Sequence, residues 1–400
     1  GAFAQSSVTM YGVVDAGYTS FSAETAGKKA TVSGVGYSSL DTSRWGLSST
    51  EDMGNGMKAG FNLETGVTDN SRGNFGYNGG ATSTVSGSSS ATDLFSAVGT
   101  KLGAVAGGGS FSASTGAGYT PSATVLGDRK LNAFVQSGDH KVQAGFDGST
   151  VRAVVTGFQP MDGNVLGNLV ANDRSLTGGS AGQGRNKSIS YTYSQPAWNA
   201  TAGYVLGNNV SVTGADDTKV TSGSQYALNY AQGPLAAGVA YAEYQGHVNA
   251  AAAVTGQIGD ASNAYAPGAK AVVASNIKTK QTAAGVSYDL QKAKVYGQYG
   301  KVSINDSLGT VTNNDERHFY SLGLTVPVGA GNVFAQHSGG KDENHSSAYQ
   351  GKVTGNSIGY RHSFSKRTTA YAAFGSVKAA TSATADVKAN QTSFGILHAF

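Results

Sequence analysis

Very few residues of this chain have types and spacings that fit catalysis. Gly178–Gly182, GGSAG, matches the G-x-S-x-G pattern of a serine nucleophile. That pattern needs a buried strand before the serine and a helix after it, so that a sharp turn exposes the hydroxyl group. Here the serine lies in a segment rich in Gly and Ser, which is typical of a loop. We therefore predict that the chain is not an enzyme and has no catalytic residue.

The sequence offers equally little evidence for a metal or cofactor site. The chain has no cysteine, which excludes thiolate metal ligands and disulfides. Gly54–Gly60, GNGMKAG, misses the G-x-G-x-x-G phosphate motif by one position and joins two strand-like stretches, so we interpret it as a hairpin turn. We predict no cofactor and no metal, because the seven histidines are scattered singly and none forms an H-x-x-x-H pair. They are His140, His247, His318, His337, His345, His362 and His398.

The basic residues are the remaining candidates for chemistry. The net charge of +4 is spread along the chain without a lysine or arginine run that could follow a phosphate backbone, so we expect no nucleic-acid partner. Arg44 and Arg361 instead stand in the middle of strand-like stretches, next to residues such as Trp45 and Tyr360. A guanidinium on the lipid side of a membrane strand would cost roughly 2–4 kcal/mol. Both arginines must therefore face water.

The elements that position these residues are short alternating strands. Val8, Met10, Val14 and Tyr18 share one side of the first strand-like stretch, and polar residues such as Asp15 occupy the other. This period of two means that one face of each strand meets an apolar medium and the other meets water. A chain with 58 Gly, 20 Tyr, 6 Pro and only 13% charged residues suits strands and turns. Its longest apolar runs are strand-sized, well below the ~18 residues of a membrane helix.

Connections between these strands alternate between short and long. The short joints span 51–56, 137–140, 195–197, 232–234, 290–293, 326–331 and 363–368, and the long polar segments span 68–128, 148–185, 207–224, 246–280 and 303–316. A soluble β-sandwich gives no reason for short turns to gather at one end. A transmembrane barrel does, because its periplasmic turns are short and its extracellular loops are long. We predict an all-β transmembrane barrel of about sixteen antiparallel strands.

The last residues, Ser393–Phe400, alternate up to the final phenylalanine. A sheet within a bilayer must close on itself, since hydrocarbon offers no partner to unpaired backbone groups. We therefore expect this segment to pair with the first strand and Phe400 to lie in the aromatic girdle.

At several of these stretches the chain resembles the Gram-negative general porins, most closely their beta-proteobacterial branch. The matching segments are Ser6–Gly17, Ser43–Gly66, Lys187–Gly207 and Gly359–Gly375, with a weaker match at Asn132–Gly138 and a final His-x-Phe. The fourth segment contains Ser365-Lys366-Arg367-Thr368, which reproduces the family's Ser-Lys-Arg-Thr turn. Together the matches run in order from Ser6 to Phe400, interrupted by loops that do not match.

The resemblance implies an outer-membrane porin, a homotrimer of barrels that pass small hydrophilic solutes and ions by passive diffusion. It also implies contacts with outer-membrane lipid and lipopolysaccharide, and export through the periplasm. Ala2-Phe3-Ala4 has the A-x-A pattern of a signal-peptidase site. We therefore expect residues 1–4 to be the remnant of an export signal and residues 5–400 to form one barrel domain.

In the family the third long loop folds into the lumen and narrows it, which here corresponds to residues 148–185. We expect a short helix within Met161–Leu176, because Val165, Leu169 and Val170 are apolar. By parity, Arg44, Lys58, Glu64 and Arg361 face the lumen, while Asp15 has a structural role. The residues expected to line the pore or its constriction are Arg44, Lys58, Glu64, Asp162, Asp173, Arg174, Arg185 and Arg361.

Two departures from the family pattern leave alternatives open. The second loop, 68–128, is enlarged, and either it is an extracellular latch to a neighbouring subunit or it adds a hairpin and makes eighteen strands. The third loop has less acidic charge than the resemblance suggests, and the basic wall residues favour a mild anion preference. A surface-exposed adhesion or binding barrel with a plugged or narrow lumen is the alternative function, for which the large loops argue.

Overall fold

The computed structural model describes residues 7–25, 28–67, 81–83, 111–113, 127–161, 164–168, 184–206, 209–210, 218–248, 275–308, 311–344, 350–381 and 386–400. The predicted export-signal remnant, residues 1–4, lies outside the described residues. So does the GGSAG stretch at 178–182.

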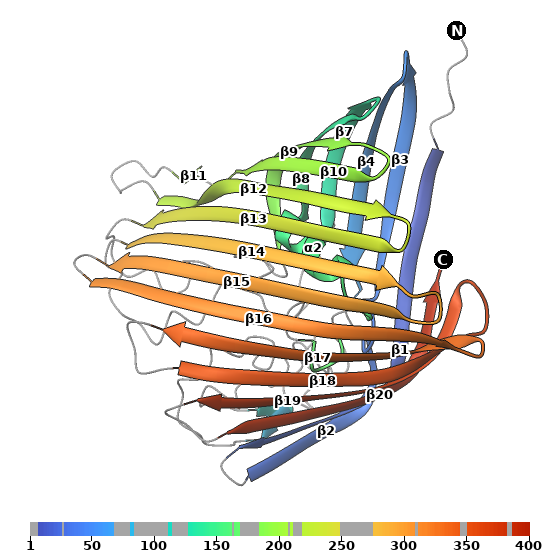
Figure 1. The fold of residues 1–400 in the computed structure, drawn as a ribbon, viewed down its shortest axis with the longest axis vertical. Coiled ribbons are helices and arrows are strands. Elements are labelled where there is room, and N and C mark those ends of the chain that lie inside the picture. The colour runs from blue at the N-terminus through green and yellow to red at the C-terminus, as the bar shows by residue number, and fades with distance from the viewer. Residues whose placement is uncertain are drawn as a thin grey trace.

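The described strands form one closed antiparallel barrel (Figure 1). Its hydrogen-bonded sheet has eighteen segments because two barrel strands are interrupted. β2 (Lys28–Tyr37) and β3 (Arg44–Gly54) pair with successive halves of β1 (Ser7–Thr25), and β11 (Asn209–Val210) continues β10 (Trp198–Val205) along β12 (Thr218–Gln232). The barrel therefore has sixteen strands, as predicted.

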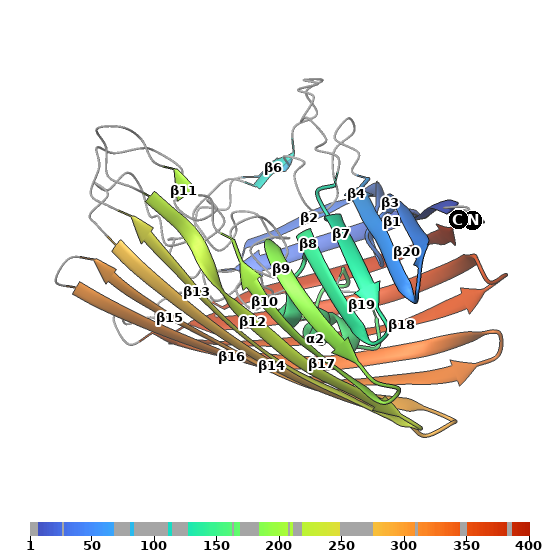
Figure 2. The same ribbon diagram turned by 90° about the horizontal axis from the view of Figure 1, so that it is seen from above.

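The barrel has a low wall and a tall wall, which are visible as short and long arrows in Figure 1 and Figure 2. The low-wall strands are 8–11 residues long: β3, β4 (Met57–Gly66), β7 (Lys130–Ser137), β8 (His140–Gly148), β9 (Arg185–Ser194) and β10. The tall-wall strands are 13–18 residues long: β12, β13 (Leu235–Val248), β14 (Ser275–Asp289), β15 (Lys294–Leu308), β16 (Val311–Val328), β17 (Gly331–Asn344), β18 (Gln350–Ser363), β19 (Thr368–Thr381) and β20 (Val387–Ala399). At ~3.3 Å of rise per residue, the longer strands make the tall wall higher than the low wall.

The first and last strands close the barrel. β1 pairs with β20 from Val13↔Ala399 to Thr25↔Val387. Gly12 and Phe400 also exchange backbone hydrogen bonds of 3.1 and 3.0 Å. Phe394 and Phe400 remain exposed on the outer face, at 54% and 42%. The pairing expected for the final segment is confirmed.

The seven predicted short joints all connect neighbouring strands at one end of the barrel, which we call the turn end. Three of them are two-residue turns that begin at Gly138, Gly233 and Gly329, with φ of 55°, 58° and 58°. Positive φ at these positions matches the turn types that follow the natural twist of a hairpin, and glycine adopts it without strain.

Each strand has one apolar and one polar face. Leu322, Ile358 and Phe394 are more than half exposed on the outer face, while their inward-facing neighbours Ser321 and Ser393 are buried. An exposed apolar band of this extent is what a membrane barrel presents to hydrocarbon, with a polar interior. Among the described residues, no helix has the length and apolarity needed to cross a membrane.

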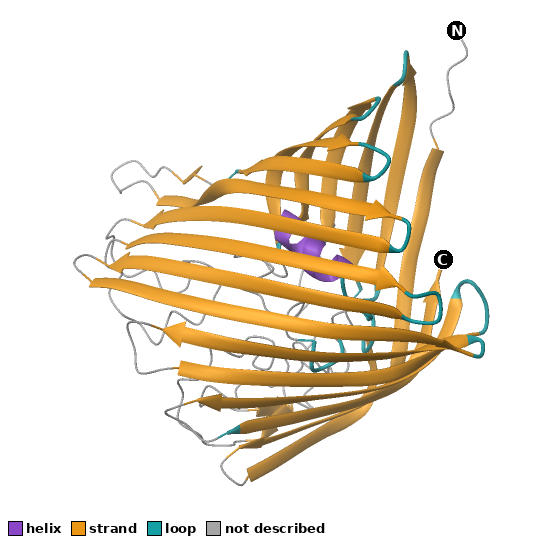
Figure 3. Cartoon of the chain, in the orientation of Figure 1, coloured by secondary structure: helices purple, strands orange, loops and turns teal. Residues whose placement is uncertain are grey.

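Within the part of the chain that the structure describes, one helix lies inside the ring of strands. α2 (Thr150–Gly157) follows β8 and appears between the walls in Figure 2 and as the purple helix in Figure 3. We expected a helix within 161–176; residues 161 and 164–168 of that range form turns and bends, and the rest of it lies outside the described residues. Ser149 sets the start of α2, because its hydroxyl accepts a 3.1 Å hydrogen bond from the Arg152 amide and caps the helix.

The structure also decides two other expectations about the loops. The long segment expected at 303–316 is mostly strand, since β15 extends to Leu308 and β16 begins at Val311. In the second loop, β5 (Ala81–Ser83) and β6 (Phe111–Ala113) pair only with each other, so they do not enlarge the barrel to eighteen strands. The remainder of that loop, 68–80, 84–110 and 114–126, lies outside the described residues.

Candidate functional site

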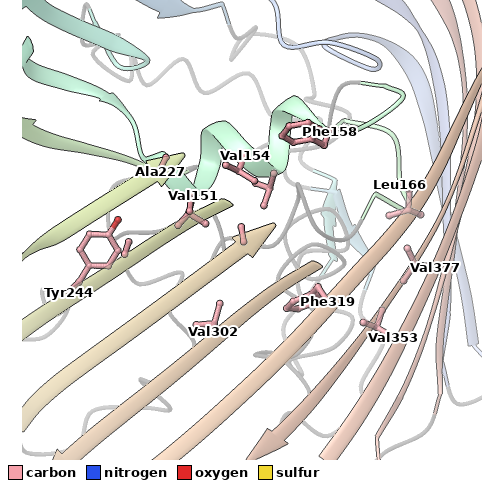
Figure 4. Close-up of a cluster of buried hydrophobic side chains, with 14 of the residues drawn as sticks. Val151, Val154, Phe158, Leu166, Ala227, Tyr244, Val302, Phe319, Val353 and Val377 are labelled. Atoms are coloured by element: carbon pink, nitrogen blue, oxygen red, sulfur yellow. The ribbon is translucent and has the colours of Figure 1, made fainter. Parts of the chain in front are cut away.

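The lumen is crossed by the segment that begins at Ser149. Its start is tied to its end, because the Ser149 amide donates a 2.8 Å hydrogen bond to the Gly184 carbonyl. The apolar face of α2, with Val151, Val154 and Val155, is buried against β12, β13 and β14 (Figure 4). These valines follow the i, i+3, i+4 spacing of one helix face. The opposite side of the segment faces the open lumen and the low wall.

Glu64 on β4 is the centre of a charged cluster on the low wall. Its carboxylate accepts a 2.7 Å hydrogen bond from Arg129 Nε and a 3.1 Å bond from the Tyr11 hydroxyl. Arg44 Nε lies 4.0 Å from the same carboxylate. Glu64 is only 5% exposed, and its position inside this ring of donors keeps it ionised.

Arg152 and Arg185 extend the cluster across the lumen. Arg152 lies on α2, within electrostatic range of Arg129 and Glu64, and Arg185 starts β9, where the loop rejoins the wall. Burial lowers the pKa of Arg152 to about 10, which still leaves the guanidinium charged at neutral pH. The cations of the cluster are Arg44, Arg129, Lys130, Arg152 and Arg185, and its carboxylates are Asp41, Glu64, Asp128 and Asp147. Five cations against four carboxylates give an excess of one positive charge.

A break in the second barrel strand, residues 38–43, aims Arg44. Arg44 Nη1 donates 2.8 Å hydrogen bonds to Asp41 and to the Thr42 carbonyl. The break is held by the buried Asp15, which accepts hydrogen bonds from the Leu40 amide, the Asp41 amide and the Tyr371 hydroxyl at 2.6, 2.8 and 2.6 Å. Asp15 is fully buried, so its role is structural, as its position in the sequence suggested.

The predicted pore residues divide into three groups. Arg44, Glu64 and Arg185 come together in the charged cluster. Lys58 is exposed near the turn end, aligned through Gln136 with Lys141, and Arg361 lies on the tall wall 5.1 Å from the Phe334 ring centroid, so neither belongs to the cluster. Asp162, Asp173 and Arg174 lie outside the described residues.

Sequence reasoning missed Arg129, Arg152 and Tyr11 as members of the site. The signal for Arg152 was present, because Val151, Val154 and Val155 define an apolar helix face that leaves residue 152 on the other side. Arg129 stands before the first residue of its strand, where alternation no longer predicts a direction.

Neighbours in known structures share this architecture. An anion-selective porin from Comamonas acidovorans matches with a TM-score of 0.63 and 21% identity, covering 99% of this chain and 100% of the other. The trimer form of OmpT from Vibrio cholerae matches with a TM-score of 0.61 and 13% identity, covering 99% and 100%. At these identities the likeness concerns the fold.

The sequence itself is similar to outer membrane porin protein 32 of Delftia acidovorans, with 44% identity over 85 residues. That stretch covers 21% of this chain and spans 24% of the length of the relative. The family pattern of the Gram-negative porins matches residues 1–382. The chain therefore belongs to the Gram-negative porin family.

Proposed function

We propose that this outer-membrane protein forms a water-filled channel for the passive diffusion of small hydrophilic solutes and ions, with an anion preference. The observation that carries the proposal is the arginine cluster around Glu64, which stands where the inward-folded segment approaches the low wall. The structurally similar porin of Comamonas acidovorans is anion-selective, which supports the sign of this preference.

The mechanism is electrostatic filtering in water. The Debye length at physiological salt is about 8 Å, so a permeating ion that passes the guanidinium groups of Arg44, Arg129 and Arg152 is only partly screened from them. Their charge raises the local concentration of anions and lowers that of cations. The segment 148–185 serves as the constriction loop and sets the size limit.

Single-channel conductance tests the channel. We expect the purified protein to insert into planar bilayers in discrete steps whose conductance rises with KCl concentration, and liposomes that contain it to swell in small sugars and not in large oligosaccharides. Protein unfolded by boiling is the control. A folded barrel that inserts and conducts nothing would favour the plugged adhesion barrel, which the family assignment does not favour.

A homotrimer is the assembly we propose. The low wall presents aliphatic residues such as Leu131, Val135 and Val142 on its outer face, at 44–52% exposed, and the similar OmpT structure is a trimer form. Native mass spectrometry in mild detergent is expected to give three times the 40.5 kDa chain mass. A single-chain mass under conditions that keep the barrel folded would contradict the trimer.

Lipid contacts follow from the outer face of the tall wall. Leu322 and Phe374 face the hydrocarbon, and ion pairs such as Lys278–Glu243 and Lys301–Glu316, nearer the loop end, meet the headgroups of outer-membrane lipid and lipopolysaccharide. Members of the family are channels, which is consistent with a protein that is not an enzyme.

A further inference from the structure

Nine consecutive strands of the tall wall, β12 to β20, each present one inward-facing glycine or glutamine to the segment 150–168. Five contribute a glycine: Gly238, Gly285, Gly323, Gly355 and Gly375 on β13, β14, β16, β18 and β19. Four contribute a glutamine: Gln225, Gln298, Gln336 and Gln391 on β12, β15, β17 and β20. We call this set of nine residues the loop seat.

The glycines are positions at which any side chain would collide with the loop. A Cβ at Gly238 would lie 2.8 Å from the Phe158 ring, and one at Gly285 would lie closer still to the same ring. A Cβ at Gly323 would lie 2.6 Å from Pro160, and one at Gly355 would lie 2.5 Å from the Gly167 carbonyl oxygen. Each distance is well inside van der Waals contact, so the wall must lack side chains along this path.

The glutamines satisfy polar groups that the loop brings into contact with the wall. Gln298 donates a 2.7 Å hydrogen bond to the Val155 carbonyl, and Gln391 accepts one of 2.8 Å from the Leu166 amide. Gln225 accepts a 3.2 Å bond from the Thr150 amide, and Gln336 donates a 3.0 Å bond to Asn168. All four glutamines are at most 6% exposed. Buried backbone groups without partners would each cost about 1–3 kcal/mol, so these side chains make the burial of the loop possible.

The far end of the loop rests on the break in the second barrel strand. Leu40 is 1% exposed and packs with Met161 and Val165, and Asn164 donates a 3.0 Å hydrogen bond to the Ser38 carbonyl. The loop is therefore held along its length and at its tip. Figure 4 shows Phe158 and Leu166 on this path, with Leu166 near Val353 and Val377 of the wall.

We propose that the nine residues of the loop seat are positioning residues of the channel: they fix the depth at which the loop crosses the lumen and thereby the place of Arg152 opposite Arg44 and Arg129. None of them belongs to the charged cluster. The proposal rests on the proposed channel function. It states that a wall surface remote from the charges of the filter determines where the filter lies.

A complementary pair of substitutions tests the seat. In Gly285→Ala the added methyl group displaces Phe158, so we expect a change of at least twofold in single-channel conductance and a lower anion-to-cation permeability ratio. Phe158→Ala removes the group that collides, and the double variant Gly285→Ala with Phe158→Ala is expected to move both values back toward those of the Phe158→Ala variant. Gly297→Ala is the matched control, because Gly297 is a tall-wall glycine whose added Cβ would lie 3.5 Å from Val286 and 4.0 Å from Leu322, ordinary contacts on the outer face.

The outcomes separate the seat from the channel itself. Wild-type protein that fails to conduct would contradict the proposed function, whatever the variants do. A conducting wild type with Gly285→Ala and Phe158→Ala channels that match Gly297→Ala would overturn the seat alone. If Gly285→Ala does not fold, Phe158→Ala, which adds no atoms, decides: wild-type conductance and selectivity in that variant would also reject the proposal.

Discussion

The low wall and the tall wall of the barrel differ in what their inner surfaces carry. The low wall, β3, β4 and β7 to β10, bears Arg44, Glu64 and Lys130 on its inner face and Arg129 directly before β7. The inner face of the tall wall, β12 to β20, carries mainly glycine, serine, glutamine and apolar residues, and its arginines Arg317 and Arg361 lie outside the charged cluster. The low wall holds the charged cluster, and the tall wall holds the loop that faces this cluster.

The difference shows how a channel separates two incompatible requirements. A filter needs ionised groups in contact with water, whereas a loop held inside a lumen needs burial and satisfied backbone groups. With both on the same strands, the loop would cover the guanidinium groups or the charges would prevent its packing. Opposite walls meet both requirements, and Arg152, on the side of α2 away from the tall wall, brings one charge of the loop into the filter.

The largest expected effect comes from a charge placed between the loop and the tall wall. Val154 is 1% exposed, so Val154→Asp would bury a carboxylate without a partner, at a cost of several kcal/mol. We expect the loop to leave the seat, with a several-fold change in conductance and a lower unfolding temperature. Ala153→Asp is the control, since Ala153 is exposed on the same helix and adds the same charge. Equal effects of Val154→Asp and Ala153→Asp would contradict the view that only one side of α2 is packed against the tall wall.

A smaller effect is expected at the strand break that supports the loop tip and aims Arg44. Asp15→Ala leaves the Leu40 and Asp41 amides and the Tyr371 hydroxyl without their acceptor, which costs about 3 kcal/mol for hydrogen bonds to a buried charged group. Denaturant unfolding in detergent measures the loss. Asp139→Ala, at an exposed turn where the carboxylate bonds only the Gln195 side chain, should cost less than about 1 kcal/mol. Unchanged stability of Asp15→Ala would mean that the break does not depend on this carboxylate.

Removing one arginine from each wall compares their contributions to selectivity. Arg129→Gln takes away a cluster charge, and an ion passing at about 4 Å would lose about 1 kcal/mol of attraction, or roughly a fivefold change in permeability ratio. Arg361→Gln on the tall wall, away from the cluster, should change the ratio by less than twofold. Permeability ratios from bilayers in a KCl gradient measure both. A larger effect for Arg361→Gln than for Arg129→Gln would contradict the account, because it would locate the filter on the tall wall.

The smallest effect is the pH dependence that Arg152 contributes. Its pKa of about 10 means that the group keeps its charge through neutral pH and loses it as the pH rises through 10. Anion preference should therefore be constant from pH 6 to 8 and fall near pH 10. Arg152→Gln is the reference, because it lacks this guanidinium and keeps every other group of the channel, and the fall should be shallower in this variant. Identical pH profiles would exclude a contribution from Arg152.

Alternation in the sequence was enough to predict the barrel. It sets the side of each strand on which Arg44, Glu64 and Arg361 lie, and the order of short and long connections sets sixteen antiparallel strands. It does not determine which inward-facing residues meet, because Arg129 and Glu64 are 65 positions apart and are brought together only by the pairing of β4 with β7. The loop seat could not be predicted from the sequence either, since its nine residues are single positions on nine strands and form no local pattern. Packing of the loop gives them a common role.

The reversal potential of the wild-type channel in a KCl gradient tests the central claim most directly. Because the guanidinium groups of the low wall face the passage left open by the loop, we expect a potential of the sign that indicates faster chloride than potassium. A potential that favours potassium would contradict the account, because it would mean that the arginine cluster does not govern the narrow part of the pore.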